Sequence, residues 1–439
     1  METLQIYWHE KKPVYSCDFH PTQALRLATC GGDNSIRLWD VSEHGDCKVK
    51  YVASLCRHIR AVNCVRWSPD GNTLASAGDG GCVMLWVRSN TPPVFTSEGV
   101  EEDLEYWQVQ QMLRVQENED LFDLCWSPDG RYLLVGGSEN AAHVFDLSVS
   151  GNNKLIKSLK EHRHYVQGVA WDPLDRWICT QSADRTLRLW AIQDKDIRNG
   201  VTRRSFVAVQ RLNKLDGDSC FEDESLVTFF RRPVFTPDGQ TLLAPAGIYQ
   251  EEKVVLLLQR ETQFASFDGC MTGHKKPPIA IRCCPWMFKI EGKEVSIFAV
   301  GNRQAVLIYD SATCTPIASL GNLHYGMVTD LSWSCDGSTL VIASQDGFCT
   351  VVRFSAGELG EIMTVEEQIA HIHRQRAAQI FADIKELVVE KQPSKENFNN
   401  EFSSPKQVMQ EQRTCVKEQP SSKKRLAPTL LSNSSNQQQ

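Results

Sequence analysis

A unit of about thirty residues recurs along this chain, and that repetition limits the fold more than any local pattern does. Its clearest copy, Glu161–Trp190, reads EHRHYVQGVAWDPLDRWICTQSADRTLRLW. Short apolar runs in this copy are separated by turns at Asp172-Pro173 and Ala183-Asp184. Because apolar runs of this length between turn residues are typical of strands, the unit predicts three short strands.

The other copies extend over most of the chain. A small sheet with one apolar face is marginal on its own, so such units bury their faces by stacking around an axis. Seven visible copies are enough to close a ring, and we expect an all-β fold, a seven-bladed β-propeller. The copies lie at 14–40, 61–86, 123–146, 161–190, 231–247, 279–288 and 328–352.

A turn of the S-P-D-G kind recurs within the copies. In such a turn proline presets φ and glycine accepts a positive φ, so we expect these segments to hold the register of the hairpins. The turns are Ser68–Gly71, Ser127–Gly130, Thr236–Gly239 and Ser334–Gly337, the last with Cys335 in place of proline.

The two ends of the repeat region are expected to meet. The segment LQIYWHE, Leu4–Glu10, alternates as a strand does but has no partner in its own repeat, and the last copy, ending near Phe354, lacks an outer strand. We predict that the first residues complete the seventh blade, which hides both sheet edges. This assigns the propeller to residues 1–356.

Charge and cysteine usage limit the environment and the partners. A formal net charge of -7 argues against a protein that coats DNA and leaves room for a basic partner such as a histone. The 16 cysteines are scattered, no two form CxxC, and no signal peptide is recognised, which indicates the cytosol or the nucleus. No apolar run is long enough to cross a membrane.

Aspartate and histidine residues recur at equivalent places in the copies. Asp33 and Asp184 each lie six residues before a tryptophan, in the turn before the third strand. There a carboxylate accepts hydrogen bonds from the backbone and from a histidine on the preceding loop. A catalytic pair is one interpretation; we favour a polar network that holds the shape of each blade. The residues assigned to this network are His58, His162, Asp33, Asp184, Trp39, Trp86 and Trp190.

Two insertions interrupt the period, at about 88–116 and about 194–228, and acidic stretches lie in both. Long loops inside a compact fold are usually functional or disordered. The acidic residues therefore either meet a basic partner or form a solvated loop. The candidate contacts in the second insertion are Asp216, Asp218, Glu222, Asp223 and Glu224.

Two adjacent arginines begin the fifth copy, in FFRRPVF. Arg231 and Arg232, at the start of a strand, are placed to project from a loop face and clamp a carboxylate or phosphate through paired hydrogen bonds. In the alternative the pair divides, with one side chain packed and the other exposed. We take both as candidate partner contacts.

The character of the chain changes after Phe354. Apolar residues at helical spacing predict an amphipathic helix within 357–391, which docks either on the propeller or on a helix of another subunit. His371 and His373 point in different directions on a helix, so they do not predict a metal site. The composition of residues 392–439 is typical of a disordered tail.

A basic and apolar island lies within this tail, at 421–431, and reads SSKKRLAPTLL. Three cations precede apolar residues, an arrangement suited to an extended peptide that docks in a groove while its cations meet acidic residues. The residues are Lys423, Lys424, Arg425, Leu426, Pro428 and Leu431.

Several strings are more specific than the repeat itself. The copies resemble WD repeats, and over residues 1–354 the strings resemble the WD-repeat middle subunit of chromatin assembly factor one (CAF-1), a replication-coupled histone chaperone. Generic WD-repeat proteins share the tryptophan and aspartate positions but not FFRRPVFTPDG or AIRCCP. The strings are YWHEKKPVYSCDFHP, HYVQGVAWDPL (His164–Leu174), FFRRPVFTPDGQTLLAPAG (Phe229–Gly247), AIRCCP (Ala280–Pro285) and LSWSCDGSTLVIASQDGFCTVVRF (Leu331–Phe354).

The resemblance implies a nuclear, non-enzymatic scaffold subunit without a cofactor. With a large acidic subunit and a small WD-repeat histone-binding subunit, it would support deposition of histones H3 and H4 on replicated or repaired DNA, touching DNA only indirectly. Histones or the large subunit would then contact the arginine pair and the acidic residues of the second insertion.

The tail island resembles the short box by which this family engages the anti-silencing histone chaperone. By that pattern the three cations meet acidic residues, Leu426 and Pro428 fill the groove, and Leu431 is a second anchor. The family box more often begins with arginines and a β-branched apolar residue. Lys423, Lys424 and Leu426 depart from it, which weakens bidentate pairing.

A second hypothesis comes from another class of protein. Many WD-repeat proteins are substrate receptors of ubiquitin ligases, and a fold does not determine a function. An enzyme is a weaker interpretation, because the chain contains no GxSxG, no HExxH and no phosphate-binding glycine loop with lysine.

Overall fold

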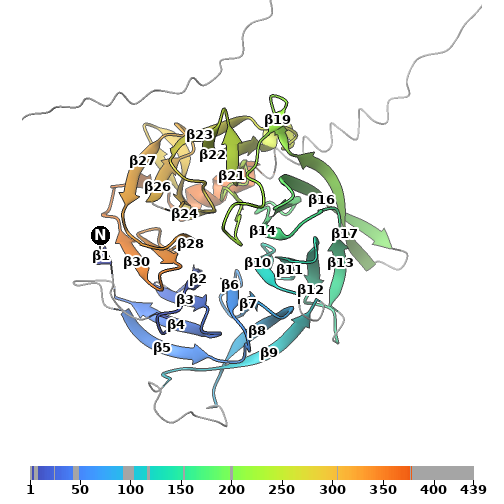
Figure 1. The fold of residues 1–439 in the computed structure, drawn as a ribbon, viewed down its shortest axis with the longest axis vertical. Coiled ribbons are helices and arrows are strands. Elements are labelled where there is room, and N and C mark those ends of the chain that lie inside the picture. Colours follow the sequence, from blue (N-terminus) through green and yellow to red (C-terminus); the bar gives the residue numbers. More distant parts are fainter. Residues whose placement is uncertain are drawn as a thin grey trace, which may run out of the picture. The chain divides into compact units, whose positions relative to one another are not determined.

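The repeats fold into small antiparallel sheets arranged around a central axis (Figure 1). The computed structural model describes residues 2–3, 8–23, 25–42, 49–91, 103–115, 119–151, 154–197, 201–303, 305–375 and 377. The chain forms two units, 1–372 and 373–439, and all the sheets belong to the first. The expected seven-bladed, all-β propeller is confirmed.

Each blade contains at least four strands, and in blades one to five the strands follow one another in chain order, beginning with the innermost. Blades one to four consist of β2 (Val14–Phe19), β3 (Arg26–Gly31), β4 (Ile36–Val41) and β5 (Val49–Leu55); β6 (Val62–Trp67), β7 (Leu74–Gly78), β8 (Cys82–Ser89) and β9 (Tyr106–Arg114); β10 (Leu121–Trp126), β11 (Tyr132–Gly137), β12 (Ala142–Asp146) and β13 (Leu155–Leu159); and β14 (Val166–Trp171), β15 (Trp177–Ser182), β16 (Thr186–Ile197) and β17 (Val201–Leu212).

The later blades carry the irregular elements. Blades five to seven consist of β20 (Val234–Phe235), β21 (Thr241–Tyr249), β22 (Glu252–Gln259) and β23 (Gly269–His274); β24 (Ala280–Ile290), β25 (Lys293–Gly301), β26 (Ala305–Asp310), β27 (Pro316–Gly321) and β31 (Glu361–Ile362); and β28 (Val328–Trp333), β29 (Thr339–Ser344), β30 (Cys349–Arg353) and β1 (Glu2–Thr3). A separate hairpin, β18 (Lys214–Leu215) with β19 (Asp218–Ser219), precedes blade five, and the 3-10 turn η1 (Arg260–Thr262) follows β22.

Apolar side chains are buried between the blades. Seven apolar clusters lie in the described part of the chain, and each combines side chains of two neighbouring blades. Between blades seven and one, for example, Val341 packs with Leu27 and with Trp8, whose ring meets Trp39 edge-on at 4.9 Å. Each sheet is too small to be stable alone, so packing against the neighbouring blades stabilises it.

The first residues close the ring. In β1, Glu2 pairs with Val351 and Thr3 with Thr350 of β30, so the predicted completion of blade seven is confirmed. The strand lies earlier than the predicted segment 4–10, whose residues 4–7 fall outside the described part. Trp8 begins a turn in which Glu10 has a positive φ of 50°, a conformation that no strand adopts.

The S-P-D-G segments form the expected turns. Gly71 and Gly130 have φ of 73° and 69°, and their amide groups donate to the carbonyl oxygens of Ser68 and Ser127 at 2.8 Å and 2.9 Å. The serine hydroxyl of each turn also donates to the aspartate two residues later. These local bonds set the register of the first hairpin in each blade.

A short helix follows the propeller, at residues 365–375. Thr364 and Glu367 form a capping box, in which each side chain accepts the backbone N–H of the other, at 3.0 Å and 3.3 Å. Lys289 Nζ lies 2.5 Å from Glu367, and Gln368 donates to the carbonyl oxygen of Pro285 at 2.9 Å. The sequence left open whether the helix docks on the propeller or on a helix of another subunit. The described part of the helix docks on the propeller, at blade six.

The described helix is too short to cross a membrane. Predicted segments from 378 onward, including the tail island at 421–431, lie outside the described residues.

Candidate partner-binding site

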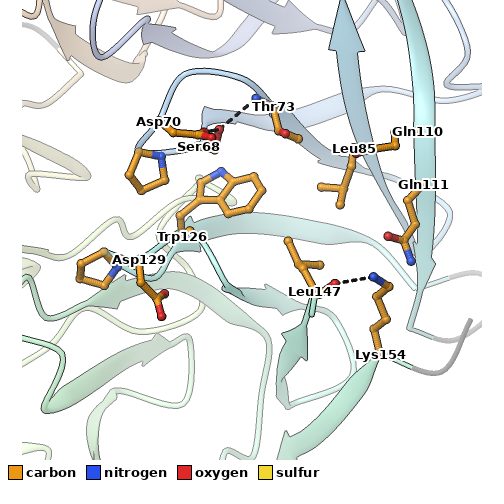
Figure 2. A pocket seen from close by; sticks show the side chains of 13 residues that line it. Ser68, Asp70, Thr73, Leu85, Gln110, Gln111, Trp126, Asp129, Leu147 and Lys154 are labelled. Carbon is orange, nitrogen blue, oxygen red and sulfur yellow. Dashed lines mark hydrogen bonds between the residues drawn. The ribbon is translucent and has the colours of Figure 1, made fainter. Parts of the chain in front are cut away.

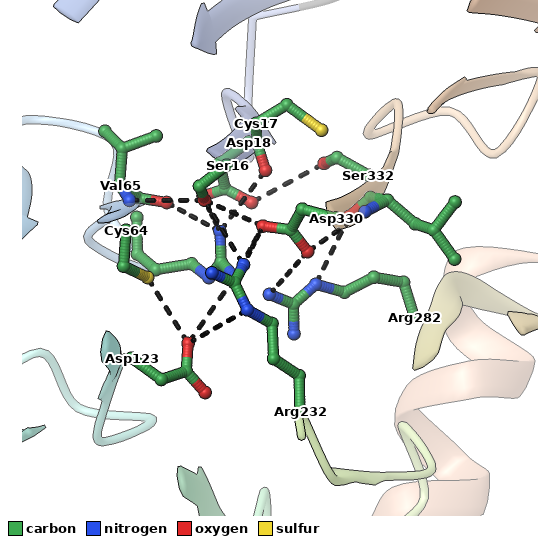
Figure 3. Close-up of polar contacts among 12 residues, drawn as sticks. Ser16, Cys17, Asp18, Cys64, Val65, Asp123, Arg232, Arg282, Asp330 and Ser332 are labelled. Atoms are coloured by element: carbon green, nitrogen blue, oxygen red, sulfur yellow. Dashed lines mark hydrogen bonds and ion pairs between the residues drawn. The ribbon is translucent and has the colours of Figure 1, made fainter. Parts of the chain in front are cut away.

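Arg232 lies two residues before β20. Its side chain points into a cluster of polar side chains (Figure 3), among residues of β6, β10 and β28, which face the centre of the ring (Figure 1). Arg232 is 0% exposed. Its Nη2 donates to the Asn63 carbonyl oxygen at 3.0 Å, its Nη1 donates to Asp330, and its Nε lies 3.7 Å from Asp123 Oδ1. Asn63, Asp123 and Asp330 belong to blades two, three and seven. One side chain thus connects blade five to three others.

Three arginines meet at Asp330 (Figure 3). Besides Arg232, Arg66 Nη2 lies 2.8 Å from Asp330 Oδ2 and Arg282 Nη2 lies 3.2 Å from Oδ1. Burial raises the pKa of the neighbouring Asp123 carboxyl, although Arg232 opposes the shift. Because removing one member leaves buried charges without a partner, the cluster makes the centre of the ring sensitive to single substitutions.

Neither of the two arrangements predicted for Arg231 and Arg232 is present. Arg231 is also 0% exposed, so the pair neither projects together nor divides into a packed and an exposed member. Arg231 donates to the carbonyl oxygens of Glu222 and Asp223 at 2.6 Å and 2.5 Å, and burial lowers its pKa to about 10. Both guanidinium groups are occupied inside the protein, Arg232 by groups at the ring centre and Arg231 by the loop that precedes it.

Two of the distinctive strings, HYVQGVAWDPL and FFRRPVFTPDG, pack against each other here. The Arg231 amide donates to the Gln167 carbonyl oxygen at 3.0 Å, and the Gln167 side chain donates to the Thr228 carbonyl oxygen at 2.9 Å. Gly168 permits this approach, since a Cβ there would lie 1.7 Å from the Arg231 carbonyl oxygen. The two distinctive strings are therefore in close backbone contact with each other.

An apolar patch is exposed beside this contact. It consists of Tyr165, Val227 and Phe229, which are 40%, 81% and 57% exposed. Buried Phe122 lies beneath it, stacked on Phe229 with ring centroids 5.6 Å apart and 5.9 Å from the Tyr165 ring. Exposed aromatic side chains held in place by a buried one are typical of partner-binding surfaces. We call these three residues the apolar patch.

Two of the predicted acidic contacts are paired within the protein. Glu222 lies 2.6 Å from Lys253 Nζ, and Asp223 lies 3.0 Å from Arg185. The Asp223 carboxyl also accepts hydrogen bonds from Ser225, which lower its pKa. These two carboxylates mainly shape the loop that precedes the apolar patch.

The other three acidic residues are exposed. Glu224 lies 3.4 Å from His164 Nε2, next to Tyr165 of the apolar patch. Asp216 and Asp218 lie in the β18–β19 hairpin, one at its turn and one in β19. The structure therefore divides the predicted acidic group, and it places Glu224 beside the patch.

The predicted polar network has its full form in blade four. His162 Nε2 lies 2.7 Å from Thr180 Oγ1 and its Nδ1 lies 3.1 Å from Asp184, while Trp190 Nε1 donates to Thr180 at 3.1 Å. Burial lowers the pKa of His162, and the hydrogen bond to His162 lowers the pKa of Asp184 against the effect of burial. His162 is 6% exposed, so its contacts are internal to the blade.

The histidine that serves blade one is His9, which sequence reasoning did not assign. His9 Nδ1 lies 2.7 Å from Asp33. His58 belongs to blade two, where its Nε2 lies 2.7 Å from Ser76 Oγ and Trp86 Nε1 donates to the same hydroxyl at 2.9 Å. Burial lowers the pKa of His58 to about 4, because no carboxylate lies beside it in the described structure to oppose the effect. His9 lies five residues before the start of β2, and His162 lies four residues before the start of β14. This similar spacing is the sequence signal that could have identified His9. In blade one, Trp39 Nε1 donates to Thr29 at 2.8 Å.

A groove of about 680 Å³ lies between blades two and three (Figure 2). The S-P-D-G turns of both blades border it, and Trp126, Leu85 and Leu147 line it. Lys154 at its edge donates to the Leu147 carbonyl oxygen at 2.6 Å. These turns follow the ends of β6 and β10, whereas Tyr165 precedes the start of β14, so the groove and the apolar patch lie at opposite ends of the strands.

The fold defines the class of this chain as a seven-bladed WD-repeat propeller whose centre is filled by the segment that carries Arg232. A family model described as the CAF1B/HIR1 beta-propeller domain matches residues 1–359. The chain belongs to this family, and the resemblance noted in the sequence is confirmed.

The chain is similar to several curated proteins. The B subunit of chromatin assembly factor 1 from Gallus gallus is 36% identical over 402 residues, which are 84% of this chain and 69% of the relative. The chromatin assembly factor 1 subunit FAS2 homolog of Oryza sativa subsp. japonica is 36% identical over 387 residues, 82% of this chain and 73% of the relative. Protein HIR1 of Kluyveromyces lactis is 27% identical over 434 residues, 89% of this chain and 48% of the relative.

Proposed function

We propose that this chain is a non-enzymatic scaffold subunit of a histone chaperone complex of the chromatin assembly factor 1 type, acting in the nucleus. Its partners would be the large and small subunits of that complex and, directly or through them, histones H3 and H4. The observation that carries the proposal is the match to chromatin assembly factor 1 relatives over most of the chain, including the strings that build the plugged centre.

The apolar patch is the surface that we assign to a partner subunit. Phe229 and Tyr165 lie in FFRRPVFTPDG and HYVQGVAWDPL, two of the strings that distinguish this propeller from generic WD-repeat proteins, and Val227 lies two residues before Phe229. Glu224 and the exposed Asp216 and Asp218 add negative charge that favours a basic partner segment, such as one from a histone.

Co-purification from nuclear extract tests this assignment. The Tyr165→Ser/Phe229→Ser variant should recover several-fold less large subunit and histone H3–H4 than the unmodified chain, because it removes the aromatic anchors. Ile317→Ser is the matched control, since Ile317 is 43% exposed on β27, away from the patch, and recovery should be unchanged. Recovery of cullin adaptors without the large subunit or histones would instead indicate a ubiquitin-ligase receptor.

We also propose that the tail island binds the anti-silencing histone chaperone. Lys423, Lys424 and Arg425 would meet acidic residues, and Leu426, Pro428 and Leu431 would dock in a groove.

Titration of purified full-length chain with that chaperone tests the tail proposal. The Leu426→Ala/Pro428→Ala variant should bind at least tenfold more weakly, because the apolar anchors supply the affinity. A melting temperature equal to that of the unmodified chain serves as the folding control. Unchanged affinity would refute the assignment.

A further inference from the structure

Blade three lacks a set of residues that blades one and four share. In blade one, Asp33 lies 2.7 Å from His9 and 3.1 Å from Arg37, which is two residues before Trp39. The arginine thus balances the buried carboxylate. The same residue types stand in blade four at His162, Asp184 and Arg188.

At the equivalent places blade three has two carboxylates and an imidazole. Glu139 lies six residues before Phe145 and His143 lies two before it, as Asp33 and Arg37 do relative to Trp39. Glu119 stands just before β10, on the segment where blade one carries its histidine. At these equivalent positions blade three therefore has one more carboxylate than blade one. It has His143 where blade one has Arg37, so no arginine balances the negative charge.

The three side chains converge on one point. A donor atom of each lies within 4.8 Å of those of the other two. Glu119 and His143 are each 2% exposed, and within the described residues Glu119 Oε2 and His143 Nε2 have no hydrogen-bond partner. These two atoms are 3.7 Å apart, too far for a hydrogen bond. Two ligands of a tetrahedral zinc ion, bound at about 2.0–2.1 Å, lie roughly 3.4 Å from each other.

The other polar atoms of the cluster hold the free ones in place. The Glu139 amide donates to Glu119 Oε1 at 3.0 Å, and His143 Nδ1 lies 3.1 Å from Ser158 Oγ. A hydrogen bond at one imidazole nitrogen orients the other toward a metal. Gly137 makes room for the carboxylate, since a Cβ there would lie 2.6 Å from Glu119 Oε1.

We propose that Glu119, Glu139 and His143 bind a divalent transition-metal ion, with zinc as the best match. One imidazole and two carboxylates form a ligand set that zinc accepts, with a fourth position for water. Magnesium and calcium favour sites made of oxygen ligands alone. The ion supplies in blade three the positive charge that Arg37 supplies in blade one, and it ties the residue before β10 to the β11–β12 turn.

Zinc titration of tag-free, chelator-treated full-length chain tests this proposal. The unmodified chain should bind one equivalent more zinc than the Glu139→Gln variant. The affinity of the variant for this equivalent should be more than about 100-fold lower, because even the loss of an outer-shell partner costs about 10–100-fold in metal affinity. Zinc should raise the melting temperature of the unmodified chain and not that of the variant. Glu252→Gln, at an exposed carboxylate at the start of β22, should behave as the unmodified chain.

A second variant separates metal binding from folding. Glu119→His/Glu139→Asp/His143→Arg installs the residues of blade one in blade three, so it should fold without zinc and lack the extra equivalent. Equal zinc binding by all variants, or an equal rise in melting temperature with magnesium, would overturn the proposal. A melting temperature that rises only as the pH falls below 7, with no response to zinc, would also overturn it and indicate a proton shared by Glu119 and Glu139.

Discussion

The centre of the ring depends on single charged side chains. Asp330 is 0% exposed and accepts from arginines of three other blades, so its carboxylate is the common counter-charge of the cluster. Buried ion pairs of this kind often add little net stability relative to an apolar core, but breaking them is costly. The cluster specifies which blades meet at the centre.

Replacing Asp330 with asparagine should therefore lower the free energy of unfolding by about 3–5 kcal/mol, because Arg66, Arg232 and Arg282 lose their buried counter-charge. Urea denaturation followed by tryptophan fluorescence measures the change. Asp216→Asn, at an exposed hairpin, is the control and should shift stability by less than about 0.5 kcal/mol. Equal unfolding midpoints for Asp330→Asn and the unmodified chain would contradict this interpretation.

Secondary-structure elements outside the repeats are held by a few polar contacts. The helix at 365–375 is fixed to the propeller by Glu367, Gln368 and His371. His371 Nδ1 lies 2.5 Å from Glu294 of β25, and its Nε2 lies 3.5 Å from Asp238 of the blade-five turn. The nearby carboxylate of Asp238 and the hydrogen bond to Glu294 raise the pKa of His371 above its ordinary value.

Docking of this helix should weaken as the pH rises. A histidine with a raised pKa stabilises the folded form fully below its unfolded pKa, about 6.5, and this contribution is lost as the pH rises through the folded value. Amide exchange of residues 365–372, corrected for the intrinsic rate, should show more protection at pH 6 than at pH 8. In His371→Gln the difference should disappear. The same pH dependence in both proteins would exclude His371 as its cause.

The whole propeller is closed by residues from both ends of the repeat region. β1 contributes two paired positions to blade seven, while Trp8 and His9 contribute to the core and polar network of blade one. The N-terminal residues therefore act at two places, and deletion of all of residues 1–10 would combine the effects.

Deleting residues 1–3 isolates the closing strand. The free energy of unfolding should fall by about 1–2 kcal/mol, because the edge of β30 loses its backbone partners. Thermal and urea unfolding measure this loss. Glu2→Ala/Thr3→Ala is the matched control, since it keeps the backbone of the strand and should retain nearly full stability. Equal stability of the deletion variant would mean that β1 does not support closure.

Local chemistry made much of this molecule predictable. Period-two apolar runs and S-P-D-G turns depend on neighbours in the sequence, so the blades, their number and their hairpin turns follow from the chain alone. The same holds for the polar network of blade four, because the spacing between Asp184 and Trp190 is local. The helix cap at Thr364 and Glu367 is also a local pattern.

The sequence by itself determined the repeat, the all-β ring, its closure by the first residues and its family. Only the tertiary structure decided what the departures from the repeat do. Arg231 and Arg232 looked like surface cations, yet both are buried. Arg232 finds acceptors at the ring centre on blades far apart in the sequence, and Arg231 finds them on the loop that precedes it. Likewise Glu119, Glu139 and His143 come together only when blade three folds, because their side chains meet across separate loops and strands.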